Sequence, residues 1–216
     1  MFDHPDSVIG VWPGEGTDVE ADDELVYRLT CEAITEDWVV EEQHFLPDGL
    51  EEIAPGPFLA AVVSSVDPSK LNGHDAVRLM QARARLVSHD EAGKLQAMAE
   101  VAFSSPGDAD SPVERSLDAV EYAGVEVAAG LALTRRAAET VLDRALSLAG
   151  VLHRVRKAFS QGRLDSARVR LFDQLLGHLP EETIDVVLDR VLDDASGLTT
   201  GQLRARFGRS RIGSRP

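Results

Sequence analysis

The longest periodic segment of this chain, from about Gly73 to Phe103, is the feature that most constrains its fold. Asn72 is a suitable N-cap for a helix starting there, and Asp75 suits the positive end of that helix. At about 1.5 Å per residue such a helix spans roughly 45 Å. We predict a long scaffold helix against which shorter helices pack. Its core-facing stripe should contain apolar residues at spacings of three and four, namely Val77, Met80, Ala84 and Val87, followed by Leu95, Met98 and Ala102.

Short periodic segments separated by turn residues fill much of the remaining chain, which predicts an all-α fold. Aromatic residues make up only 5 % of the sequence, and a core of small and medium aliphatic side chains suits close helix packing. Gly162 stands where a C-cap glycine would end one helix, and Thr199 or Thr200 can cap the last one. The predicted shorter helices are Phe58–Val66, Val125–Leu131, Arg135–Ala149, Leu152–Ser160, Leu164–His178, Glu181–Asp194 and one ending near Phe207.

Charge divides the chain into unequal parts. Residues 1–60 carry 16 acidic residues and a single basic one, Arg28, whereas the rest of the chain is neutral in sum. We predict an acidic, partly disordered region over residues 1–56 with one helix between Asp22 and Val40, and a linker rich in proline and glycine at 47–57. A helical domain over 57–207 and a loose basic tail over 208–216 would follow. The acidic region would either cover a basic face or only keep the protein soluble.

Several classes of protein are disfavoured by residues that the sequence lacks. It has one cysteine, Cys31, no secretory signal at its start and no apolar stretch of membrane-spanning length, so we expect a cytoplasmic protein. It has no phosphate-binding loop and no nucleophile elbow. We therefore predict no cofactor, no metal, no catalytic residue and no membrane contact.

The segment around Val125 to Leu148 fits a helix-turn-helix unit. Such a unit needs a small residue where its helices cross, a tight turn four residues later and a helix cap two residues further on. Ala128, Ala132 and Thr134 stand at these positions. The turn usually has glycine because its backbone is left-handed, so alanine there costs about 1 kcal/mol. The second helix would pack back through Ala138, Val141 and Leu142.

The outer face of that second helix could contact DNA. Arginine binds guanine edges with two hydrogen bonds, and threonine reaches a phosphate or a methyl group. Glu139 and Asp143 on this face would either accept a hydrogen bond from cytosine or be solvated. A plain bend between two bundle helices explains the same residues. The side chains expected to be exposed are Arg135, Arg136, Glu139, Thr140 and Asp143.

Residues 135–170 carry nine basic side chains and three acidic ones, which indicates a phosphate-contacting surface or an ordinary solvated face. Few aromatic residues interleave with them, so duplex DNA is favoured over a single strand. Arg170 belongs to this basic run. The DNA hypothesis requires that these groups share one solvent-facing side. The predicted nucleic-acid contacts are Thr134, Arg135, Arg136, Thr140, Arg144, Arg154, Arg156, Lys157, Arg163 and Arg168.

Two resemblances carry further expectations. The run Gly162-Arg-Leu-Asp-Ser-Ala-Arg168 and the helix-turn-helix before it resemble the helical unit of partition-type DNA-binding proteins. Residues 57–207 are similar to the domain of unknown function 222, which precedes HNH endonuclease domains in actinobacterial proteins. The likeness is carried by the order of Leu71-Asn-Gly-His-Asp-Ala-Val77, the long helix, Glu126-Val-Ala128, Gly162-Arg-Leu164 and Leu198-Thr-Thr-Gly-Gln-Leu-Arg204.

This second resemblance implies a role in DNA processing or mobile elements. The HNH pattern itself is not in the sequence, and none of the six histidines stands in one. His74 and His89 are about four helical turns apart, too far to share a metal. We therefore predict a non-catalytic, nuclease-associated DNA-binding domain. The alternative is a helical bundle that binds an acidic protein partner.

Overall fold

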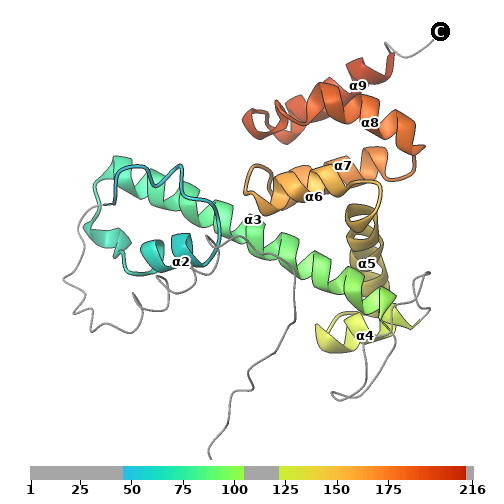
Figure 1. The fold of residues 1–216 in the computed structure, drawn as a ribbon, viewed down its shortest axis with the longest axis horizontal. Helices are drawn as coiled ribbons and strands as arrows, with labels where there is room; N and C mark the ends of the chain where they lie inside the picture. The colour runs from blue at the N-terminus through green and yellow to red at the C-terminus, as the bar shows by residue number, and fades with distance from the viewer. Residues whose placement is uncertain (1–45, 105–121, 213–216) are drawn as a thin grey trace, which may run out of the picture. The chain divides into compact units, whose positions relative to one another are not determined.

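The computed structural model describes residues 46–104 and 122–212, and this part of the chain is helical without a β-strand (Figure 1). The predicted all-α class is therefore confirmed. The helix expected between Asp22 and Val40, together with Cys31, lies outside the described residues. In chain order the elements are α2 (Pro57–Ser64), the 3₁₀ helix η1 (Pro68–Lys70), α3 (Gly73–Phe103), α4 (Ala123–Gly130), α5 (Arg135–Ala149), α6 (His153–Ser160), α7 (Ser166–Leu176), α8 (Glu181–Val191), η2 (Ala195–Gly197) and α9 (Thr200–Ile212).

Helix α3 is the predicted scaffold, with the predicted bounds. The Asn72 side chain accepts a hydrogen bond of 2.9 Å from the backbone N–H of Asp75 and so caps the helix start. The first half of α3 packs with α2 around one apolar cluster, whereas its second half packs with α4, α5 and α6 in another (Figure 1). The helix is thus shared between two cores.

The predicted apolar stripe of α3 is correct only in its second half. Leu95, Met98 and Ala102 are buried. In the first half the buried apolar residues are Leu79 and Ala82, which share a cluster with residues of α2. The predicted stripe there is exposed to solvent, because α2 covers a face of the helix that the three- and four-residue pattern did not select. The exposed residues are Val77, Met80, Ala84 and Val87.

The helical domain also begins earlier than the predicted linker at 47–57. Leu46 and Leu50 are buried in the cluster with α2 and α3. The guanidinium of Arg85 donates hydrogen bonds of 2.7 to 2.9 Å to the backbone oxygens of Leu50, Glu51 and Ile53. These contacts hold the segment against α3, so the expected boundary at residue 56 is wrong. A turn rich in proline and glycine can belong to a packed domain when its apolar residues reach the core.

The chain after α5 forms a series of short helices whose ends follow the predicted signals. Gly162, with φ of +69°, ends α6, and His89 Nδ1 of α3 lies 2.8 Å from the backbone oxygen of Ser160. Phe172 of α7 and Phe207 of α9 meet edge to face with ring centres 5.1 Å apart. Helix α9 continues to Ile212, so residues 208–212 are helical rather than part of a loose tail.

Among the described helices, none has the length and apolar character needed to cross a membrane.

Candidate nucleic-acid interface

Helices α4 and α5 form the predicted helix-turn-helix unit. Ala132 between them has φ of +52°, the left-handed conformation expected at the turn. The N–H of Leu133 donates to the backbone oxygen of Ala128 at 2.9 Å, which closes the end of α4 in the manner of a Schellman motif. Thr134 then caps α5, accepting a hydrogen bond of 3.3 Å from the N–H of Ala137. The turn and the cap therefore stand where the sequence placed them.

The two helices cross closely through small side chains. Ala138 and Leu142 of α5 are buried, and Ala128 of α4 packs against the same core. A Cβ atom added at Gly124 would lie 3.3 Å from Cγ of Glu139, so the approach is also tight one turn before Ala128. This packing fixes which side of α5 faces solvent.

The exposed side of α5 carries the residues expected there. Arg135, Arg136, Glu139, Thr140 and Asp143 are all exposed. Arg135 Nε donates to Glu139 Oε1 at 2.8 Å, but its side chain remains 75 % exposed, so this ion pair is a weak surface contact. No acidic partner lies beside Arg136 within the described part of the chain.

An open hollow of about 580 Å³ lies beside α5, lined by side chains of α5 and α7. Three arginines converge on it: Arg136, Arg144 and Arg170. Arg144 Nε lies 3.3 Å from Asp173 Oδ2, yet no hydrogen bond with acceptable geometry forms at this buried nitrogen. The other lining residues are Thr134, Ala137, Thr140, Val141 and Gln174.

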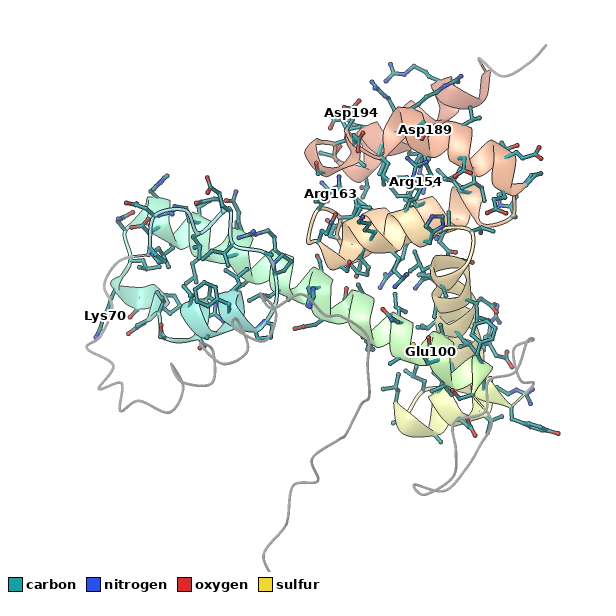
Figure 2. The ribbon with its side chains drawn as sticks, viewed as in Figure 1. Lys70, Glu100, Arg154, Arg163, Asp189 and Asp194 are labelled. Atoms are coloured by element: carbon teal, nitrogen blue, oxygen red, sulfur yellow. The ribbon has the colours of Figure 1, made fainter. Side chains whose placement is uncertain are left out.

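Arg154 and Arg163 instead face acidic side chains. Arg154 Nη1 lies 2.8 Å from Asp189 Oδ1, between α6 and α8 (Figure 2). Arg163 lies 3.8 Å from Asp193, a looser ion pair. The predicted single surface is therefore divided, because acids distant in sequence neutralise part of the basic run.

Arg168 holds the fold together rather than presenting a charge. Its guanidinium donates to the backbone oxygens of Ala195 and Leu198 at 2.7 to 3.1 Å and pairs with Asp165. The side chain is only 21 % exposed. The predicted phosphate contact at Arg168 is thus replaced by a link between α7 and the segment before α9.

The two remaining predicted contacts differ from each other. Arg156 is half-buried and donates to Gln96 Oε1 of α3 at 3.0 Å, whereas Lys157 is exposed. Arg170 belonged to the predicted phosphate-contacting run, although it was not among the individually predicted contacts. The structure places it across from α5, beside the hollow. That position depends on the packing of α7, which no local pattern encodes.

The one strong pair of pKa shifts in the described residues lies away from this interface. A hydrogen bond from Arg78 lowers the pKa of Glu51 to about 2, and the same contact raises the pKa of Arg78. The two side chains meet at 2.5 Å and join the segment before α2 to α3. No group of three or more His, Cys, Asp or Glu side chains within the described ranges is placed to hold a metal ion.

Comparisons with family models, with curated proteins and with solved structures found no match. The resemblances drawn from the sequence motifs therefore stay predictions.

Proposed function

We propose that this chain is a non-catalytic DNA-binding domain in which α5 enters the major groove of a duplex. The observation that carries the proposal is the α4–α5 unit, with its left-handed turn at Ala132, the Thr134 cap and an outward face bearing Arg135 and Arg136. An exposed helix of this kind presents side chains of its first turns to base edges. Thr140 lies on the same face.

The charges around α5 support contact with an anionic polymer. Although residues 1–60 make the whole chain acidic, the hollow beside α5 has arginines on two helices and no acidic side chain in its wall. A local field of this sign attracts a polyanion even when the net charge of the protein is negative. The family likeness extends the proposal to nuclease-associated DNA processing in mobile elements. A single cysteine, which cannot form a disulfide within the chain, is typical of a protein located in the cytoplasm.

Duplex DNA titrated into the full-length protein by fluorescence anisotropy tests the proposal. We expect the affinity to fall steeply between roughly 50 and 200 mM salt, because displaced counterions drive the contact. The double variant Arg135→Gln with Arg136→Gln should bind more than about tenfold more weakly, since groove contacts of arginine are each worth about 1–3 kcal/mol. Arg190→Gln is the control. It removes one charge, where the α5 variant removes two, from an exposed arginine on α8, and it should leave the affinity unchanged.

Two results would overturn the proposal. One is the absence of salt-dependent binding by the wild-type chain. The other is a loss of binding free energy per removed charge that is the same for the α5 variant and the α8 control, which would mean that net charge rather than the helix face determines binding. Preferential competition by an acidic peptide, with no DNA binding, would support the helical bundle with an acidic protein partner.

A further inference from the structure

We propose that the hollow between α5 and α7 is a binding site for one phosphodiester group of the DNA backbone, with Arg136 and Arg170 as its main ligands. The inference rests on the proposed function and adds a second helix to the contact surface. It also gives Arg170, a member of the predicted phosphate-contacting run, a defined partner helix in α5.

The strongest argument is the set of chemical groups in the wall. Guanidinium groups come from Arg136 and Arg144 of α5 and from Arg170 of α7, and a hydroxyl comes from Thr134. The hydroxyl of Thr140 also lines the hollow, but it already donates to the backbone oxygen of Arg136 at 2.9 Å. The guanidinium groups and the Thr134 hydroxyl can donate hydrogen bonds to an oxyanion, and arginine matches two phosphate oxygens at once. A wall of donors without a carboxylate is suited to an anion and unsuited to a cation.

The second argument concerns the missing counter-charges. Arg154, Arg163 and Arg168 are each placed beside a carboxylate. Arg136 and Arg170 are exposed and, among the described residues, form no ion pair with a carboxylate. Two like charges directed at one hollow repel each other, so an anion between them removes a cost as well as adding an attraction.

Arg144 supplies a third and different feature. Its side chain is only 16 % exposed, and its buried Nε has no hydrogen-bond partner although Asp173 lies 3.3 Å away. A buried donor without an acceptor is unfavourable, because it has lost its hydrogen bond to water. Because Nε itself is covered by protein atoms, Arg144 contributes to the hollow through its charge and as one of the lining side chains.

The charges on the adjacent elements do not neutralise the positive charge of the hollow. A neighbouring small hollow shares Arg144 and Arg170 and adds Glu91 and Lys94 of α3, which are opposite in sign. Asp173 faces Arg144, and Glu139 on α5 is engaged by Arg135. Asp173 balances the charge of Arg144, which leaves the two positive charges of Arg136 and Arg170. A bound phosphodiester carries one negative charge, so the occupied site would keep one positive charge.

The position of the hollow explains what such a contact would do. Thr134 and Arg136 are at the start of α5, where the first backbone N–H groups have no partner within the helix and favour an anion. Arg170 approaches from α7. A phosphate held from two helices would set the rotation and depth of α5, because backbone contacts position a protein while base contacts give specificity.

The test compares Arg170→Gln with Arg190→Gln in the full-length chain, using duplex DNA over a range of salt concentrations. Loss of one phosphate contact should lower the magnitude of the slope of log affinity against log salt by about 1 and weaken binding roughly uniformly across DNA sequences. We expect the slope to change for Arg170→Gln and to stay at the wild-type value for Arg190→Gln. Arg170→Lys should keep the wild-type slope, since the charge is retained. It should lose part of the affinity, since lysine cannot form the bidentate hydrogen bonds of arginine.

Each outcome decides between the two proposals. A wild-type chain that binds DNA, with an unchanged slope for Arg170→Gln, overturns the phosphate site and leaves the helix-turn-helix contact intact. A wild-type chain without salt-dependent DNA binding overturns both. If Arg170→Gln weakens binding of a polyglutamate peptide but not of DNA, the hollow takes carboxylates and the phosphate assignment is wrong. Helix content measured by circular dichroism should be the same for all variants, because Arg170 and Arg190 are exposed.

Discussion

Replacing Gly162 by alanine should destabilise the domain more than its small size suggests. Gly162 has φ of +69° and follows the end of α6, where its N–H and that of Arg163 donate at 2.9 and 3.0 Å to the backbone oxygens of Phe159 and Ala158. A left-handed alanine costs about 1–2 kcal/mol. The conformation cannot relax without breaking these two bonds, which close the helix.

Steric overlap adds a second cost. A Cβ atom at position 162 would lie 2.7 Å from Cβ and 3.0 Å from Cα of Arg85. Arg85 cannot move away easily, because its guanidinium is held by three backbone oxygens of the segment before α2. Overpacking of this kind costs about 1–3 kcal/mol. Together the two effects predict a loss of about 2–5 kcal/mol in the free energy of unfolding.

Urea denaturation followed by far-ultraviolet circular dichroism measures this loss. Gly93→Ala is the matched control on α3, because nothing lies within 4 Å of the added Cβ. Glycine in a helix interior is less favourable than alanine by about 1 kcal/mol, so this variant should be more stable than the wild type. A Gly162→Ala protein within about 0.5 kcal/mol of wild type, at an equal denaturant slope, would refute the reasoning.

Two further predictions concern stability. Ala132→Gly should raise the free energy of unfolding by about 1 kcal/mol in the same denaturation experiment, because glycine removes the left-handed strain, and an unchanged or lower value would contradict this. The lowered pKa of Glu51 means that its contact with Arg78 stabilises the fold above the ordinary pKa of 4.5 and that this stabilisation is lost as the pH falls toward about 2. Glu51→Gln should therefore weaken the pH dependence of stability in that acidic range, and an acid unfolding curve identical to wild type would argue against the pair.

Local signals in the sequence determined most helix boundaries. Asn72 begins α3, Thr134 begins α5 and Gly162 ends α6, each through hydrogen bonds or backbone angles that depend on nearby residues only. The helix-turn-helix turn was also readable, because its spacing of small residue, turn and cap is a local pattern. The left-handed backbone of Ala132 was predicted as well, because the pattern places this residue at the turn.

Tertiary structure decided which faces and charges remained free. The stripe from Val77 to Val87 has a helical period but is exposed, because α2 and the segment containing Leu50 pack on another side of α3. The partners of the basic run came from distant residues, such as Asp189 for Arg154 and the backbone oxygen of Leu198 for Arg168. Periodicity shows that a helix has an apolar face, and a charge count shows that cations are present. Only the packing of one helix on another determines whether that face is covered and whether those cations already have partners.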